Sequence, residues 1–339
     1  MNGRMRNVVL AVGVGLVLLL GIPAGVLTWF SMRPVALPKP VLVKIEAGRS
    51  FTSVAQELEQ AGVVMDGRAL RLLARLKQAD RGIHAGVYRF TGSQSPLQVL
   101  EIMRSGRVEM VHTTIPEGLR AREVVARCVE AGLGRMERYA SLLEDEGFIK
   151  DLGLKDLGRD VSDLEGYLFP ETYHFAPGTS EAAVLRTMVE QMQAHLSPEL
   201  LDAEAQHGLN PHELVTLASI IQKEAGNEAE MARISAVFHN RLQRNMRLQS
   251  DPTVIYSLED FDGNLTRAHL RQYHQYNTYT IPGLPPGPIA CPGAAALHAA
   301  AFPADDDALY FVATREGGHH FSKTLREHNN AVRRYQLRK

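Results

Sequence analysis

One carboxyl group stands out because of the residues that precede it. Glu224 follows an apolar stretch, and at 100° per residue Leu217, Ile220 and Ile221 lie about one helical turn before it, whereas Lys223 points to the opposite side. A carboxyl group set against apolar side chains is poorly hydrated, which raises its pKa and favours the protonated form that a general acid needs. Glu224 is therefore a candidate catalytic acid. The plainer alternative is a solvated glutamate, or one paired with a basic neighbour.

The helix that would position Glu224 is predicted to begin at Pro211. Asn210 can cap it, proline suits its first turn, and Glu213 stands three residues after the cap, as in a capping box. Apolar residues then recur at helical spacing, which predicts one buried face. The residues of that face are Leu214, Leu217, Ala218, Ile221 and Ala225.

Other chemistries have little basis in the sequence. There are thirteen histidines but no H-E-x-x-H motif, and His319, His320 and His328 lack a recognised zinc-ligand spacing. Neither a G-x-S-x-G motif nor a P-loop occurs. The net charge of -1 gives no reason to expect nucleic acid. We therefore expect no metal ion, no cofactor and no nucleic-acid partner.

The first residues predict attachment to a membrane. Residues 8–30 carry no charge, and at about 1.5 Å per residue a helix of this length reaches roughly 34 Å, enough to cross a bilayer core. Arg4 and Arg6 precede the apolar run, so residues 1–7 are expected in the cytoplasm and the rest of the chain outside. A cleaved signal peptide is the alternative, although the run is long for one and no A-x-A site ends it.

The remaining sequence predicts a linker and two α+β domains. Residues 31–40 contain three prolines and are expected to form a stiff, extended stalk. Residues 41–107 show signals for strand, helix, helix, strand and helix, and residues 108–339 form a larger mixed domain. Three side chains are placed to cap the helices of the smaller domain: Ser50, Asp66 and Ser95. Two cysteines, Cys128 and Cys291, are too few for a disulfide scaffold, and whether they pair stays open.

Several longer motifs occur in a fixed order along most of the chain after the apolar run. They are GVYRF (86–90), LEGYLFPETY (164–173), LASIIQKEA (217–225), VFHNRL (237–242), MRLQSDPTVIY (246–256), YNTY (276–279), GLPPG (283–287), YFVA (310–313) and GGH (317–319). Together they closely resemble the YceG-like family, the endolytic murein transglycosylases called MltG. The agreement extends over so much of the chain that chance similarity is a poor explanation.

The resemblance implies a peptidoglycan-cleaving enzyme of the cell envelope. It implies one inner-membrane helix over residues 8–30, a LysM-like subdomain over residues 41–107 and a periplasmic YceG-like catalytic domain over residues 108–339. The substrate would be nascent glycan strands, cut internally between MurNAc and GlcNAc to leave 1,6-anhydroMurNAc ends. Such cuts help to terminate glycan elongation, in proximity to peptidoglycan synthases.

The resemblance also places the catalytic carboxyl group at Glu224. The family motif usually reads Glu-Lys-Glu and its second glutamate is catalytic, but Gln222 replaces the first one here. Two helical steps separate these side chains by about 160°, so we expect this replacement to be tolerated. One carboxyl group can suffice, because a hydroxyl of the substrate itself acts as the nucleophile.

Four polar residues are expected to line the groove for the glycan. Gln249, Asp251, Asn277 and Tyr279 supply the amide, carboxylate and aromatic groups that sugar rings and N-acetyl groups require. Plainer interpretations exist, since Asp251 can begin a turn, Tyr279 can lie in the core and Asn240-Arg241 can be a pair on a helix surface. Two other functions also stay open, namely a hydrolytic muramidase and a non-catalytic scaffold that binds glycan.

Overall fold

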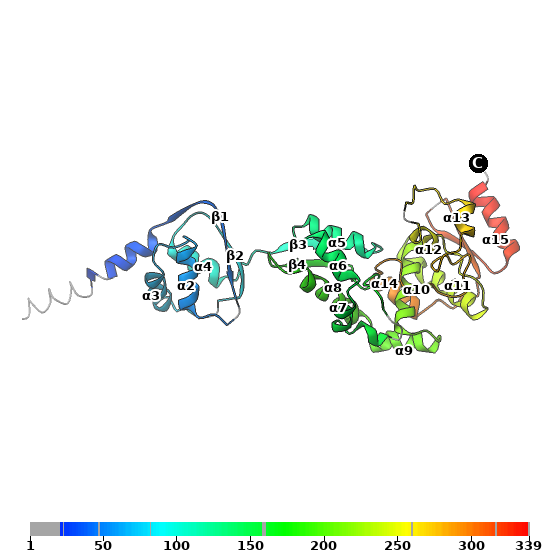
Figure 1. Ribbon diagram of the computed structural model, residues 1–339, viewed down its shortest axis with the longest axis horizontal. Helices are drawn as coiled ribbons and strands as arrows, with labels where there is room; N and C mark the ends of the chain where they lie inside the picture. Colours follow the sequence, from blue (N-terminus) through cyan, green and yellow to red (C-terminus); the bar gives the residue numbers. More distant parts are fainter. Residues whose placement is uncertain are drawn as a thin grey trace, which may run out of the picture. The chain divides into compact units, whose positions relative to one another are not determined.

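The computed structural model describes residues 21–22, 24–46, 48–81, 83–157, 161–258, 260–315 and 317–337. The chain forms two compact units, Met1–Val111 and His112–Lys339 (Figure 1). The predicted cytoplasmic tail and most of the predicted membrane segment lie outside the described residues. Within the described ranges, no helix is both long enough and apolar enough to span a membrane.

The smaller unit packs three helices against a two-stranded antiparallel sheet. Its elements are β1 (Val35–Ile45), α2 (Phe51–Gln60), α3 (Gly67–Leu76), β2 (Gly86–Gln94) and α4 (Pro96–Arg104). The predicted caps are confirmed: Ser50, Asp66 and Ser95 each accept a backbone N–H of the first helical turn. Apolar side chains of all five elements then form one buried core, and a helical segment over residues 24–32 adds Leu27 and Phe30 to it.

The segment predicted as a linker differs from that prediction. Residues 31–32 end the helical segment, and Val35 already pairs with Gln94 in the sheet. The pairing is interrupted between Leu37 and Val41, where Pro38 and Pro40 lack the N–H groups that a regular ladder requires. The prolines therefore mark an irregularity inside β1. They do not form the separate stalk that the sequence predicted over residues 31–40.

The larger unit is mostly helical and contains two further two-stranded sheets, β3 with β4 and β5 with β6. The chain is thus a mixed α+β protein with small sheets, as the sequence predicted. Its elements are β3 (Val111–Thr114), α5 (Ala121–Glu130), α6 (Met136–Leu143), α7 (Glu146–Asp151), η1 (Leu154–Leu157), β4 (Thr172–Phe175), α8 (Glu181–His195), α9 (Pro198–Gln206), α10 (Pro211–Glu224), η2 (Glu228–Glu230), α11 (Met231–Gln243), α12 (Asp251–Tyr256), α13 (Arg267–Arg271), α14 (Ala294–Ala301), β5 (Tyr310–Ala313), β6 (His319–Ser322), α15 (Leu325–Val332) and η3 (Arg333–Leu337).

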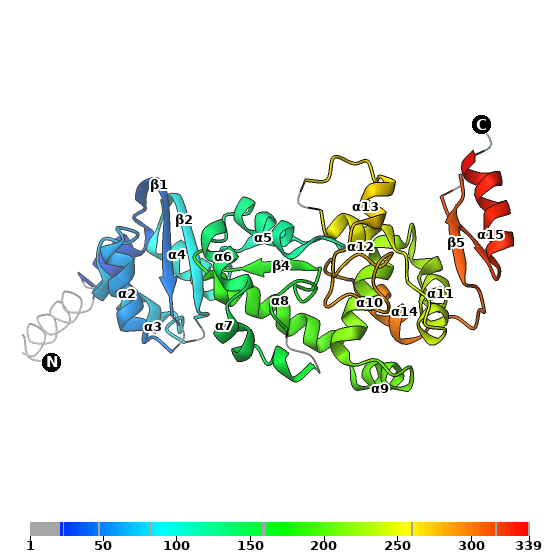
Figure 2. The ribbon, with the colours of Figure 1, turned by 45° about the vertical axis from the view of Figure 1, so that its right-hand side comes forward.

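Helix α10 lies at the centre of this unit. It begins at Pro211 with the predicted capping box of Asn210 and Glu213, but every side chain from Leu214 to Ile221 is buried, so burial is not limited to one face. Helices α9, α11, α12 and α14 all contact it (Figures 1 and 2). Helix α14 is almost entirely alanine, and these small side chains allow close packing. The centre of the unit therefore holds Glu224 on a rigid support.

Candidate active site

Glu224 is the last residue of α10 and is partly buried. The hydroxyl group of the buried Ser250 donates a hydrogen bond of 2.6 Å to its Oε1 atom. Burial raises the pKa of Glu224 to about 7, with a further increase from the negative charge of Asp251; the Ser250 hydrogen bond and the positive charge of Arg241 oppose this shift. The expected desolvation of this carboxyl group is confirmed, so it can give and take a proton near neutral pH.

Glu224 faces a pocket of about 350 Å³ that has two chemically different sides. The polar side of the pocket consists of Glu224, Arg241, Gln249, Asp251 and Tyr279, together with the apolar Leu248. The C-terminal side of the pocket comes from β5, β6, α15 and η3, and it is largely aromatic and aliphatic. Its residues are Tyr310, Phe311, Val312, Ala313, His319, Leu325, His328, Val332 and Gln336. A lining that combines polar groups with aromatic and aliphatic side chains suits a sugar, which has hydroxyl edges and apolar ring faces.

Three of the four predicted groove residues line this pocket. Gln249 is exposed and adopts a left-handed backbone conformation with φ of 49°. Asp251 begins α12, and its Oδ1 atom accepts a hydrogen bond of 2.6 Å from the hydroxyl group of Tyr279. Burial raises the pKa of Tyr279, which keeps the phenol protonated and able to donate. The structure therefore brings Gln249, Asp251 and Tyr279 together with Glu224.

The fourth residue, Asn277, does not line the pocket, so its expected position is corrected. Its side chain is buried, with 1% exposure, and its amide group donates to the carbonyl groups of His269 and Gln272. Its side-chain oxygen accepts the backbone N–H of Tyr279. Asn277 satisfies backbone groups of an irregular segment, which must be paired when they are buried. It positions Tyr279 without facing the pocket.

Gln222, which replaces the usual first glutamate of the family motif, also points elsewhere. Its side-chain oxygen accepts the backbone N–H of Gly293, the residue that precedes α14. A carboxylate could accept the same hydrogen bond, so the contact explains why glutamine can occupy this position. The pocket is thus left with Glu224 as its carboxyl group on α10.

Sequence reasoning missed the contribution of α11. Asn240 and Arg241 were candidates for a helix surface pair, but Asn240 donates to the carbonyl groups of Asp306 and Ala308, and Arg241 is buried. Arg241 follows the buried Val237 by four residues, so its place on the inner face could have been found from helical spacing. Ser250 was also missed, because no local pattern connects it with Glu224.

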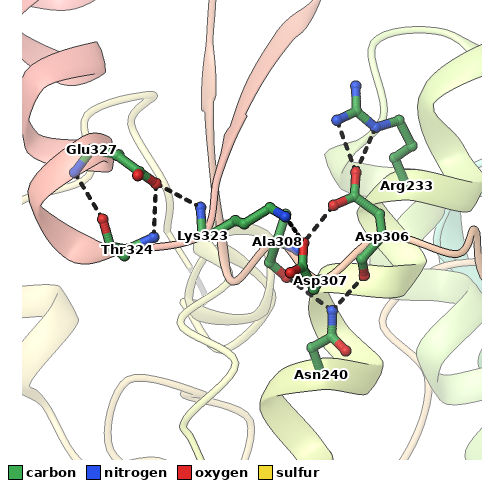
Figure 3. Close-up of polar contacts among 8 residues, drawn as sticks. All are labelled: Arg233, Asn240, Asp306, Asp307, Ala308, Lys323, Thr324 and Glu327. Atoms are coloured by element: carbon green, nitrogen blue, oxygen red, sulfur yellow. Dashed lines mark hydrogen bonds and ion pairs between the residues drawn. The ribbon is translucent and has the colours of Figure 1, made fainter.

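A polar network holds the start of β5 against α11 (Figure 3). Arg233 binds the carboxylate of Asp306 at 2.8 Å, and Asp306 in turn accepts the backbone N–H of Ala308. Asn240 adds the two carbonyl contacts described above (Figure 3). This network fixes the segment that leads into the C-terminal side of the pocket.

His319 and the two cysteines take no part in a metal site or a disulfide within the described part of the chain. The Nδ1 atom of His319 lies 3.0 Å from a carboxylate oxygen of Glu230, and the backbone N–H of His319 donates to the same carboxylate. Among the described residues, no group of three or more His, Cys, Asp or Glu side chains is arranged to hold a metal ion. Cys128 and Cys291 are both buried, free thiols.

The fold and the pocket define an α+β protein whose central helix ends in a protonatable carboxyl group, Glu224, at a pocket lined by polar and aromatic side chains. The chain belongs to the YceG-like family, whose profile matches residues 43–334. It is 32% identical over 306 residues to the endolytic murein transglycosylase of Bacillus subtilis (strain 168), covering 87% of this chain and 84% of that protein.

Two further comparisons agree with this assignment. The endolytic murein transglycosylase of Streptococcus pneumoniae serotype 2 is 29% identical over 323 residues, and the match covers 87% of this chain but 58% of the longer streptococcal protein. The crystal structure of a putative YceG-like protein from Listeria monocytogenes aligns with a TM-score of 0.60 at 29% identity, covering 87% of this chain and 99% of that one.

Proposed function

We propose that this chain is an endolytic murein transglycosylase, an enzyme that cuts peptidoglycan strands between MurNAc and GlcNAc. The observation that carries the proposal is the setting of Glu224, whose pKa of about 7 and position in the pocket suit both donation and acceptance of a proton. Family membership and the names of the relatives support the choice of murein as the substrate.

In the proposed reaction Glu224 acts first as an acid and then as a base. Its proton passes to the glycosidic oxygen while the bond from that oxygen to C1 of MurNAc breaks, and the oxygen keeps the bonding electron pair. The C6 hydroxyl group of the same MurNAc then bonds to C1 and returns its proton to Glu224. The products are a free GlcNAc hydroxyl group and a 1,6-anhydroMurNAc end, and no water is consumed.

The products distinguish this reaction from hydrolysis. Ordinary glycosidases use two carboxyl groups, and Asp251 is a second carboxyl group in the pocket. Because its Oδ1 atom accepts a hydrogen bond from the hydroxyl group of Tyr279, we expect Asp251 to orient the bound substrate and not to activate water. Mass spectrometry of glycan digested by the purified protein should therefore detect 1,6-anhydroMurNAc ends. Reducing MurNAc ends in their place would identify a hydrolytic muramidase.

The smaller unit is proposed to be LysM-like and to hold the glycan. The order β1, α2, α3, β2 supports this proposal, as does a small pocket of about 130 Å³ between the turns that leave β1 and approach β2. Polar and aromatic side chains line that pocket, including Glu46, Arg49, Phe51 and Asp80. Such a unit would keep the strand near the larger unit between successive cuts.

We further propose a single-pass inner-membrane protein in which the chain after residue 30 lies in the periplasm, close to peptidoglycan synthases. The charge-free run over residues 8–30 supports the anchor.

Arginine at the centre of a membrane helix costs about 3 kcal/mol per residue, so the double substitution Leu18→Arg, Leu19→Arg should release the protein from membranes during alkaline extraction. The double variant Leu18→Ile, Leu19→Ile is the matched control. Retention of the arginine variant would contradict the anchor.

A further inference from the structure

Arg241 carries a buried positive charge beside Glu224. Its side chain on α11 is 7% exposed, its Nε atom donates to the carbonyl group of Leu309 at 2.7 Å, and its Nη1 atom donates to that of Leu248 at 2.6 Å. Burial lowers the pKa of the guanidinium group, but arginine stays protonated at neutral pH. These hydrogen bonds to neutral carbonyl groups compensate for lost hydration and leave the positive charge in place.

The same side chain connects the two sides of the pocket. Leu248 directly precedes the left-handed residue Gln249 and the Glu224 partner Ser250, whereas Leu309 directly precedes β5. A left-handed conformation is strained for a non-glycine residue and persists only where neighbouring contacts hold it. Arg241 supplies such a contact through the carbonyl group of Leu248, and the backbone N–H of Gln249 donates to the Thr278 carbonyl group.

The other titratable groups that line the pocket with Glu224 are Asp251, Tyr279, Tyr310, His319 and His328. Asp251 on α12 is acidic, and Tyr279 is neutral because burial raises its pKa. On the C-terminal side, Tyr310 stacks on His328, and burial with the nearby charge of Arg241 lowers the pKa of that histidine. His319 is bound to the Glu230 carboxylate.

Lys223, the residue before Glu224, directs its Nζ atom to the carbonyl group of Gly118 at 3.1 Å, and it does not line the pocket. Among the described residues that line the pocket, Arg241 is the arginine or lysine whose charge lowers the pKa of Glu224, in the same direction as the larger effect of the Ser250 hydrogen bond.

We propose that Arg241 is a positioning residue for the transglycosylase reaction, stabilising the carboxylate form of Glu224 between its two proton transfers and fixing both sides of the pocket. The inference rests on the proposed function of Glu224. After Glu224 has protonated the glycosidic oxygen, it must remain a carboxylate until the C6 hydroxyl group returns a proton. The charge of Arg241 lowers the energy of that intermediate state, and its hydrogen bond to the Leu248 carbonyl group holds the segment that leads to Ser250.

The test compares Arg241→Gln and Arg241→Lys through the pH dependence of kcat for release of 1,6-anhydro products. Arg241→Gln removes the charge, so the carboxylate is less stable; we expect the alkaline limb of the profile, where Glu224 loses its proton, to move upward by about one pH unit and kcat at pH 7 to fall at least about tenfold. Arg241→Lys keeps a positive charge but lacks the planar fork that donates to the carbonyl groups of both Leu248 and Leu309. We therefore expect kcat to fall while the alkaline limb stays near its original pH.

Arg244→Gln is the matched control, because Arg244 is an exposed arginine that follows the last residue of the same helix. It should leave the profile unchanged. A purely structural role for Arg241 would lower kcat in Arg241→Gln without moving the alkaline limb, and this result overturns the proposal. If Arg241→Gln does not fold, Arg241→Lys tests the positioning role, since full activity or a displaced alkaline limb in that variant contradicts the proposal. Activity in Glu224→Gln would instead overturn the proposed function itself.

Discussion

Glu224→Gln is expected to abolish glycan cleavage while leaving the fold and glycan binding intact. A positioned general acid or base contributes about 10²- to 10⁴-fold to a rate. Since one residue performs both proton transfers here, we expect kcat to fall by at least about 10³-fold. The amide keeps the shape of the side chain, and its oxygen can still accept the Ser250 hydroxyl group that now donates to Oε1.

The measurement is the release of 1,6-anhydroMurNAc ends from purified glycan strands, followed by mass spectrometry, together with glycan sedimentation to measure binding. Glu228→Gln is the matched control, because Glu228 is an exposed carboxyl group in the 3₁₀ turn that follows α10. Its activity should equal that of the parent protein. If Glu224→Gln cuts as fast as the parent, the site assignment is wrong; if the parent binds glycan but never cuts it, the chain is a scaffold.

How well each part of this site could be predicted depended on whether local sequence determines it. The start of α10 follows from neighbouring residues, because Asn210, Pro211 and Glu213 form a capping box within four positions. The environment of Glu224 was also predictable, since hydrophobic residues one turn earlier lie beside it. Local rules of this kind also located the helix caps of the smaller unit.

Features that depend on tertiary contacts were not predictable in the same way. The C-terminal side of the pocket lies more than eighty positions beyond Glu224 in the sequence, and no periodic pattern connects β5 or α15 with α10. Asn277 has a side chain suited to a sugar, but the irregular backbone around it uses every polar atom of that side chain. The prolines of β1 indicated an extended chain correctly, yet only the partner strand shows that this chain belongs to a sheet.

The second large effect concerns stability, and it arises from Glu204 on α9. This side chain is 1% exposed, and neither of its carboxyl oxygens has a hydrogen-bond partner among the described residues. Burial raises its pKa to about 7, and the negative charge of Glu213 adds to the increase. Below about pH 7 the folded protein therefore holds Glu204 mostly in its neutral form, because an ionised carboxylate without partners is costly to bury.

The direction of the pH effect follows from the raised pKa. Below the unfolded value of 4.5 the carboxyl group is protonated in both states, and its contribution to stability is complete. As the pH rises towards about 7 the unfolded chain loses this proton first, so the free energy of unfolding falls, by about 3 kcal/mol in total at about 1.4 kcal/mol per pH unit. Above pH 7 the folded protein also ionises and this loss ends.

Glu204→Leu removes the titrating group and fills its site with an apolar side chain. The variant should unfold at a higher urea concentration than the parent at pH 8, with an advantage of about 2–3 kcal/mol. The advantage should shrink towards pH 5, where the parent protein regains its stability. Glu199→Leu, an exposed carboxyl group on the same helix, should show no such dependence on pH. Equal stability differences at both pH values for Glu204→Leu would mean that Glu204 is ionised in the folded protein, with partners formed by a rearranged α9.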